Sequence, residues 1–402
     1  MKHFIITLFI IIASFTQYVY GVEIDGINYK FSGDEATVIS WPLDGGKTYS
    51  GNVVIPEFVT YEGREYCVKI IGSGAFDGCN IITSVIIPNS VTTIEYVAFR
   101  NCSNLSDINI GTNVTRVSLN AFSGTAWYDN LPDGMVYVGK VAYKYKGEMP
   151  EGTHFSIKEG TLSISEQAFA LCSGLASVTI PEGITTIEEL AFGGCANLVS
   201  VKLPESLTSI GPGVFSDCVS LSSIDIPKGT TRIGSGAFAR CRSLSSITIP
   251  EGSWYIYPNT FYGCVNLAAV VLPESLRIID SFAFMSCSGL QSIVCNASVP
   301  PSYGQLVFYG VDKQNCKLYV PKGCEEAYRA AELWKDFNII EMGTGISEMQ
   351  NERVKSEKYD TTLYDLHGRK VIGAEANSSL FTLHSSLKKG LYIVNGRKIA
   401  VK

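Results

Sequence analysis

Apolar residues recur along the middle of this chain with a fixed period of 23 positions. The period is clearest from Ala168 to Ile293, where AFALCSGLASVTIPEGITTIEEL is followed directly by AFGGCANLVSVKLPESLTSIGPG. A fixed interval of this length is typical of a solenoid, in which each repeat forms one coil of the chain. The aromatic residues that mark the repeats are Phe76, Phe99, Phe122, Phe169, Phe192, Phe215, Phe238, Phe261 and Phe284.

Each repeat contains three shorter patterns that predict its local structure. The first is Leu-x-x-Val/Ile-x-Ile/Leu-Pro, as in Leu175 to Pro181, and it predicts a strand with one face in a core. The second is Val-Thr-Thr-Ile, as in Val91 to Ile94, which predicts a second and shorter strand. The third is Ala-Phe-x-x-Cys, which predicts one turn of α-helix or 3₁₀-helix with Phe and Cys facing inward.

The consensus Ala-Phe-x-x-Cys-x-x-Leu-x-x-Ile-x-Ile-Pro resembles the BspA-like leucine-rich repeat family, which is known from surface proteins of Bacteroidota. The resemblance extends from about Ile70 to Ile293 and keeps its phase with one interruption. It implies a β-rich leucine-rich-repeat solenoid of parallel stacked short strands, joined by short helical or 3₁₀ turns. It also implies adhesion rather than catalysis.

The interruption lies between Phe122 and Phe169, which are 47 residues apart where two repeats would take 46. Residues from Tyr137 to Tyr145 alternate on both sides of Gly139-Lys140, which predicts a β-hairpin. We expect this insertion, near residues 127–150, to bulge from one coil. A hairpin of this kind also occurs in the family that the repeats resemble.

The segments on both sides of the repeats predict caps, because an open solenoid end exposes core and an unpaired strand edge. In the C-terminal cap we expect a strand, a helix from about Cys324 to Trp334 and another strand, with Tyr328, Trp334 and Phe337 over the last coil. The predicted organisation is a signal peptide at 1–21, a β-type N-terminal cap at 22–69, the solenoid at 70–293, an α/β C-terminal cap at 294–340, a linker at 341–356 and a small β-rich module at 357–402.

Both ends of the chain carry patterns that are typical of export. Lys2 precedes an apolar run from Phe4 to Phe15 and a small-residue cleavage site at Gly21, as in a secretory signal peptide. The tail resembles the C-terminal sorting domain of the type IX secretion system in Leu363-Tyr-Asp-Leu-x-Gly-Arg369 and in Lys389 to Val394. This resemblance implies contact with that secretion machinery and a bacterial surface location associated with the outer membrane. A small β module with another use is the alternative.

Twelve cysteines in an exported protein would ordinarily suggest disulfides. Eight of them, however, lie three residues after a repeat phenylalanine, so their side chains should be parallel and about 4.8 Å apart in stacked coils. A disulfide needs closer and converging Cβ atoms. We therefore predict a column of buried free thiols, and any disulfide should come from Cys295, Cys316 and Cys324.

The composition argues against several classes of function. The formal net charge of −6 and the lack of a basic run argue against nucleic-acid binding. No second apolar run is long enough for an integral membrane span. Only four histidines occur, and no catalytic or phosphate-binding motif appears. We therefore expect no enzymatic activity, no cofactor and no metal. The recurring carboxylates Glu182, Glu205, Glu251 and Glu274 should form a solvated row.

Two groups of aromatic residues depart from the repeat and are the candidate ligand-binding residues. In one group, aromatics replace the Thr-Thr/Ser of the short strand, and the other group surrounds the hairpin. Exposed aromatics favour binding of a peptide or sugar, but both groups could instead fill irregular coils. The candidates are Trp254, Tyr255, Tyr257 and Tyr262, together with Trp127, Tyr128, Tyr137 and Tyr143.

These observations predict a non-enzymatic, exported cell-surface protein that binds a host or microbial protein or glycan through its solenoid. The long strands offer mostly short polar residues outward, such as Ser177, Ser200 and Ser246, which supply few anchors for a partner. The alternative function is therefore a structural surface scaffold that displays other components without a specific ligand.

Overall fold

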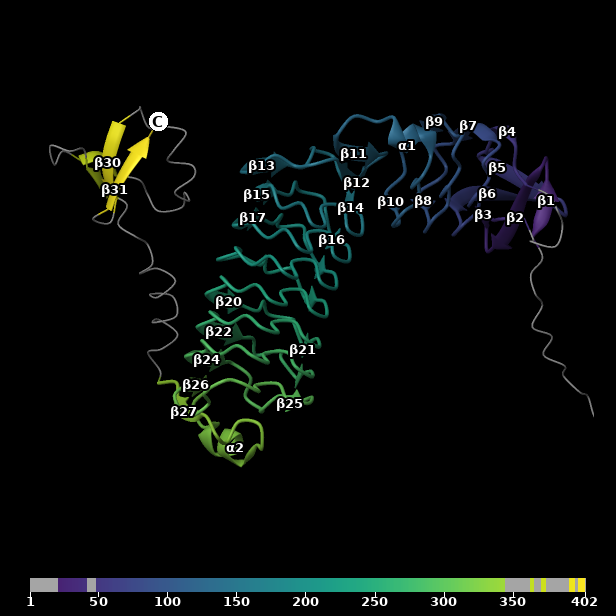
Figure 1. Ribbon diagram of the computed structural model, residues 1–402. Helices are drawn as coiled ribbons and strands as arrows, with labels where there is room; N and C mark the ends of the chain where they lie inside the picture. The colour runs from purple at the N-terminus through teal and green to yellow at the C-terminus, as the bar shows by residue number, and fades with distance from the viewer. Residues whose placement is uncertain are drawn as a thin grey trace, which may run out of the picture. The chain divides into compact units, whose positions relative to one another are not determined.

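The computed structural model describes residues 21–41 and 48–343, together with the backbone of four strands between residues 362 and 401 (Figure 1). The chain divides into two compact units, Met1–Ile340 and Glu341–Lys402. Predictions for the signal peptide, for the linker after residue 343 and for the turns of the tail lie outside the described residues. No helix among the described residues is long and apolar enough to cross a membrane.

The first unit is a parallel β-solenoid of about 12 turns, as predicted, and most coils have strands on two faces. Neighbouring coils pair in register at the repeat spacing, for example Ser177 with Ser200 and Thr186 with Ser209. The longer strands are β4 (Gly51–Val54), β7 (Ile82–Ile87), β9 (Asp107–Ile110), β13 (Thr153–Ser156), β15 (Leu175–Thr179), β17 (Ser200–Lys202), β20 (Ser246–Thr248), β22 (Ala269–Leu272), β24 (Ser292–Cys295), β26 (Lys317–Val320) and β27 (Asn338–Glu341). The shorter strands are β8 (Thr93–Ile94), β10 (Arg116–Val117), β14 (Ser163–Ile164), β16 (Thr186–Ile187), β18 (Ser209–Ile210), β19 (Arg232–Ile233), β21 (Tyr255–Ile256), β23 (Ile278–Ile279) and β25 (Ser302–Tyr303).

The N-terminal strands cover the first coil and also extend one of its sheets. The strands are β1 (Val22–Ile24), β2 (Ile27–Ser32), β3 (Glu35–Val38), β5 (Phe58–Tyr61) and β6 (Arg64–Ile71). Antiparallel pairing joins β1 to β2, β2 to β3 and β5 to β6, whereas β6 pairs in parallel with β3 and with the short strand β8. The ring of Tyr49 lies 4.5 Å from that of Phe76, so an aromatic side chain closes the end of the core.

The core is built around stacked phenylalanine rings, which come from the turns that lead from each short strand to the next long strand. Rings on successive coils are nearly parallel, with centroids 4.9 to 5.6 Å apart, from Phe76 to Phe122 and again from Phe169 to Phe308. Each fully buried Phe side chain contributes on the order of 1.5–3 kcal/mol of transfer free energy, and offset ring contacts add to it. Even Phe308, which is one residue out of step in the sequence, stacks on Phe284.

The predicted helical turn at Ala-Phe-x-x-Cys is wrong, because this segment forms a ladder of turns. The residues two before and two after each Phe have positive φ, as at Leu190 (φ 54°) and Gly194 (φ 73°) around Phe192. Because these residues have left-handed backbone, successive N–H groups point in different directions. One N–H donates to a carbonyl within the same turn, and the next donates to a carbonyl of the following coil. The Phe192 N–H, for example, donates to the Val214 carbonyl at 3.0 Å.

All twelve cysteines are free, as predicted for the eight in phase with the repeat. Six of the buried thiols also donate a hydrogen bond to a carbonyl on the coil before them: those of Cys102, Cys195, Cys218, Cys241, Cys264 and Cys287. Cys195 Sγ donates to the carbonyl of Phe169 at 3.0 Å, and Cys218 Sγ donates to that of Phe192 at 3.2 Å. The thiol therefore fills the core as a small apolar group and also links neighbouring coils.

The recurring glutamates are exposed, and two of them cap the next turn. The Glu182 carboxylate accepts from the backbone N–H of Glu205 at 3.1 Å and of Ser206 at 3.2 Å, and Glu251 accepts from residues 274 and 275 in the same way. The bond from Glu205 lowers the pKa of Glu182. These carboxylates therefore stabilise the stacking of coils.

The hairpin consists of β11 (Gly134–Val138) and β12 (Val141–Lys146) and is preceded by α1 (Ala126–Asp129). The prediction of a hairpin is confirmed, but it does not bulge from the coil. Strand β12 pairs in parallel with β14, and Val138, Val141 and Ala142 are completely buried. The hairpin thus replaces part of a coil (Figure 1), and the core is divided into two clusters of buried residues at this point.

The C-terminal end of the first unit has the predicted aromatic cover. Rings of Trp334 and Phe337 lie 5.5 and 5.1 Å from Phe308, and Tyr328 packs on Trp334. The helix α2 spans only Glu325–Ala330 and not residues 324–334, because Ala331 has extended backbone.

In the second unit, β29 (Lys370–Gly373), β28 (Thr362–Tyr364), β30 (Gly390–Val394) and β31 (Arg397–Val401) form one antiparallel sheet in that order.

Candidate functional site

The ladder of short strands is interrupted where aromatic residues enter the repeat. Strand β18 pairs with β19, and β21 pairs with β23, but β19 and β21 belong to different sheets. The interruption is visible in the backbone hydrogen bond that the residue after each short strand donates to the coil before it. Gly211 N–H donates to the Ile187 carbonyl and Gly234 N–H to that of Ile210, yet no such bond leads from residue 257 to residue 233 within the described chain. The interruption marks this position as structurally distinct.

Three predicted residues come together at this interruption, and we call Trp254, Tyr255 and Tyr257 the aromatic cluster. The Trp254 and Tyr255 rings lie 5.4 Å apart, and the Tyr255 and Tyr257 rings 4.7 Å apart, both in edge-on contact. Trp254 is 56% exposed, while the two tyrosines are half-buried. An exposed indole held by two packed rings is a rigid apolar surface that a ligand can contact at little entropic cost.

Two charged residues from neighbouring coils fix the tyrosines of the cluster. The Tyr255 hydroxyl donates to the Asp280 carboxylate, and the guanidinium of Arg232 lies 5.9 Å from the ring centre of Tyr257. The hydrogen bond to Asp280 raises the pKa of Tyr255 to about 12, and the same bond lowers the pKa of Asp280. Both groups are therefore in their ordinary charge states at neutral pH, which leaves a carboxylate and a guanidinium beside the rings.

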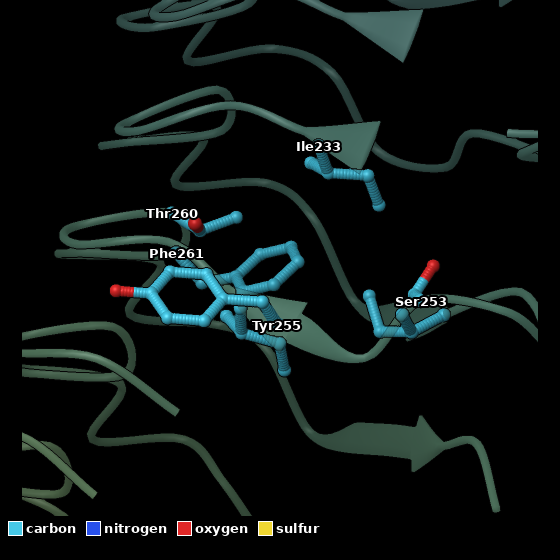
Figure 2. Close-up of a pocket in the computed structure, with 7 residues that line it drawn as sticks. Ile233, Ser253, Tyr255, Thr260 and Phe261 are labelled. Atoms are coloured by element: carbon cyan, nitrogen blue, oxygen red, sulfur yellow. The ribbon is translucent and has the colours of Figure 1, made fainter. Parts of the chain in front are cut away.

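A small cavity of about 10 Å³ lies beneath the cluster, with Ile233 on one coil and Ser253, Tyr255 and Phe261 on the next (Figure 2). It is large enough for about one water molecule at most, so it cannot hold a ligand. The Ser253 hydroxyl is buried and has no hydrogen-bond partner among the described residues. Buried apolar residues such as Leu207 and Leu276 hold this position in other coils, so the smaller serine accounts for the void.

The hairpin aromatics are used mainly for packing. Tyr143 is 5% exposed and its hydroxyl accepts from the Phe122 N–H at 3.3 Å, so its prediction as a ligand-binding residue is wrong. Trp127 is half-buried with its ring 5.0 Å from Phe122, and Tyr128 makes an edge contact with Tyr143. The hydroxyl of Tyr137 accepts from the N–H of Lys158 at 3.0 Å.

Tyr262, the remaining candidate, lies in the turn that follows Phe261 and is half-buried. Its carbonyl accepts from the N–H of Arg240 at 2.6 Å. No ring contact joins Tyr262 to the aromatic cluster in the part of the chain that the structure describes. It is therefore not part of the same surface.

Arg232 and Asp280 were not among the predicted site residues, although the repeat contains a signal for them. Arg232 lies 23 positions before Tyr255, and Asp280 lies 23 positions after Tyr257. Side chains one repeat apart are neighbours on adjacent coils, so the register alone places both residues beside the cluster.

The model of the family described as "BspA type Leucine rich repeat region (6 copies)" matches residues 64–150, 136–255 and 254–348. These matches together run through most of the chain. The chain belongs to the BspA-type leucine-rich repeat family. The aromatic cluster and the hairpin are two places where the regular BspA-type solenoid is interrupted. No curated protein matches the chain.

Several solved structures are similar to this BspA-type chain in sequence and fold. A leucine-rich repeat protein from Bacteroides ovatus is 25% identical and covers 81% of this chain and 100% of its own, with a TM-score of 0.32. A leucine rich cell surface protein from Faecalibacterium prausnitzii is 23% identical over 70% of this chain and 94% of its own, with a TM-score of 0.28. The T. pallidum leucine rich repeat protein TpLRR is 24% identical over 48% and 84%, with a TM-score of 0.36.

Proposed function

We propose that the protein is a non-enzymatic recognition protein of a bacterial surface, and that it binds a host or microbial protein or glycan through the aromatic cluster. Exposure of Trp254 within a rigid group of rings carries this proposal. Interfaces concentrate binding energy in Trp, Tyr and Arg, and all three types meet here. The BspA-type family suggests a protein-binding or adhesion scaffold, and its solenoid fold is typically non-catalytic.

The termini have a part in the same proposal. Residues 1–21 act as a signal peptide, and residues 357–402 act as a sorting module that contacts the type IX secretion machinery and keeps the protein at the outer membrane. The motif Leu363 to Arg369 and the antiparallel sheet β29-β28-β30-β31 support this role. Deletion of residues 357–402 should leave the solenoid folded and abolish surface retention; normal surface display of the truncated protein would exclude the sorting role.

The test of recognition is a screen of the full chain against immobilised extracellular proteins and a glycan array. Trp254→Ala should remove the signal from any specific ligand, because it removes the exposed ring. Tyr96→Ala is a matched control, since Tyr96 is also an exposed aromatic, at 47%, on another coil. Equal loss in both variants, or no loss in Trp254→Ala, would contradict the proposed site. The absence of any ligand would favour the scaffold role.

A further inference from the structure

The turns of the solenoid are joined by a repeated row of backbone hydrogen bonds. In eight coils, three N–H groups donate to carbonyls of the following coil: those of the Phe and of the residues two before and two after it. The donors alternate with residues whose N–H bonds within the turn. The last complete set comprises Phe282, Phe284 and Ser286, which donate to Gln305, Val307 and Tyr309 at 2.9, 3.1 and 2.7 Å.

The equivalent row in the last coil has no acceptors. The N–H groups of Leu306, Phe308 and Gly310 make no hydrogen bond within the described residues, because no further coil follows. All three residues line a groove of about 450 Å³, a volume within the range of roughly 300–1,000 Å³ that is usual for ligand sites. We call it the terminal groove. Its wall also includes Tyr303, Tyr309, Lys313, Glu332 and Asp336.

Leu306, one of these three donors, has a side chain that does not favour the folded state of the free protein. Leu306 has a φ of 51° and is 53% exposed. At the same position Gly213, Gly236 and Asn259 accept a left-handed backbone readily, whereas Leu190 and Phe282 share the positive φ of Leu306. An exposed leucine in this conformation therefore lowers stability and solubility. Tyr309, 61% exposed, and Tyr303, 45% exposed, lie in the same groove wall.

The spacing and charge of the terminal groove indicate the chemistry of its ligand. Donors on alternate residues form a row, and in eight earlier coils such a row binds the alternate carbonyls of a neighbouring chain segment. The charged groups at the rim already have partners: Lys313 lies 3.6 Å from Asp336, and Lys335 lies 2.8 Å from Glu332. The free features are thus backbone donors and apolar side chains, which fit an extended peptide rather than a lone anion.

We propose that the terminal groove binds an extended peptide segment of a partner protein as one additional rung of the solenoid. Alternate carbonyls of the peptide accept from Leu306, Phe308 and Gly310. An apolar side chain of the peptide lies between the rings of Tyr303 and Tyr309 and the side chain of Leu306. This site is separate from the aromatic cluster and does not depend on the function proposed there.

Amide hydrogen exchange on the full chain tests the donors directly. Without peptide, the N–H groups of Leu306 and Gly310 should exchange at least tenfold faster than those of Phe282 and Ser286. The probe is a synthetic peptide that copies residues 303–311, the segment that accepts from the preceding coil. Its addition should slow exchange at 306, 308 and 310. Equal protection of both sets in the free protein would overturn the proposal.

Two variants separate binding from folding. Leu306→Gly should lower affinity for the peptide at least tenfold and leave Tm unchanged or higher, because glycine tolerates the positive φ. Leu171→Gly is the matched control: Leu171 has a φ of 62°, is 78% exposed, and its N–H is already bonded to the Gly193 carbonyl. The affinity of Leu171→Gly for the peptide should stay at the wild-type value. Wild-type affinity in Leu306→Gly, no binding of the peptide, or competition by inorganic phosphate would each contradict a peptide groove.

Discussion

The Sγ atom of Cys241 donates a hydrogen bond to the main-chain oxygen of Phe215 one coil earlier, at 3.1 Å. The same contact joins Cys264 to Phe238 and Cys287 to Phe261. A repeated cysteine at this position is therefore explained by shape and by a weak donor, without oxidation or metal binding. The thiol column is part of what holds neighbouring coils in register.

Thiol titration should count twelve free cysteines in the unfolded, unreduced protein. In the folded protein the buried thiols, such as Cys241, should be inert, because only a thiolate reacts and burial raises the pKa of this group. A dye reagent such as Ellman's, applied with and without denaturant, makes the measurement. Pairing of all in-phase cysteines would contradict the column.

The same thiols should make the protein lose stability in alkali. Burial raises the pKa of Cys218 and of Cys264 from 9.0 to about 12. Because the pKa of each thiol is higher in the folded than in the unfolded protein, the contribution of the thiol to the free energy of unfolding is complete below about pH 9. This contribution is lost as pH rises toward 12. Each such thiol should lower the free energy of unfolding by ~1.4 kcal/mol per pH unit in that range. Urea unfolding across this range should be less pH-dependent in Cys218→Ala than in wild type; identical slopes would refute the assignment.

Replacing Leu171 by glycine should raise the free energy of unfolding by about 1 kcal/mol, because leucine is strained at positive φ and its side chain is mostly exposed. Thermal unfolding measures the change. Gly194→Ala gives the opposite test, since Gly194 has a φ of 73° and an added Cβ would lie 2.6 Å from a Leu171 side-chain carbon. That variant should be less stable than wild type.

Ser253→Val should also stabilise the protein, by about 1–2 kcal/mol, because it removes an unpaired buried hydroxyl and fills part of the cavity. Thr230→Val is the control at the same position of the preceding coil. The Thr230 hydroxyl donates to the Leu207 carbonyl at 2.9 Å, so its loss should cost about 1 kcal/mol. A shift of stability in the same direction in both variants would contradict the claim that the Ser253 hydroxyl has no hydrogen-bond partner.

The regular part of the fold was predictable from the sequence because a strict period constrains every coil in the same way. The repeat predicts Phe192 and Cys195 in the core, and both are completely buried. The spacing of Ala-Phe-x-x-Cys predicts a helical turn at the same residues, because nothing about a leucine indicates the positive φ that Leu190 adopts. Backbone conformation that opposes residue preference cannot be read from composition.

Predicting the site was harder because it depends on where the repeat fails. The position of Trp254 was apparent from its replacement of threonine, and its exposure agrees with a surface position. The burial of Tyr143 is not apparent from the sequence, because the hairpin pattern does not show that β12 pairs with β14 and takes the place of a coil strand. The terminal groove was missed because unpaired N–H groups leave no signal in side-chain identity.

The most direct measurement of recognition by the aromatic cluster is hydroxyl-radical footprinting of the full chain with a ligand from the screen. Bound ligand should reduce oxidation of Trp254 and Tyr257 several-fold while leaving the exposed Tyr96 unchanged, because only the cluster would be covered. Unchanged oxidation of Trp254 in the saturated complex, with protection elsewhere on the solenoid, would show that the cluster is not the recognition site.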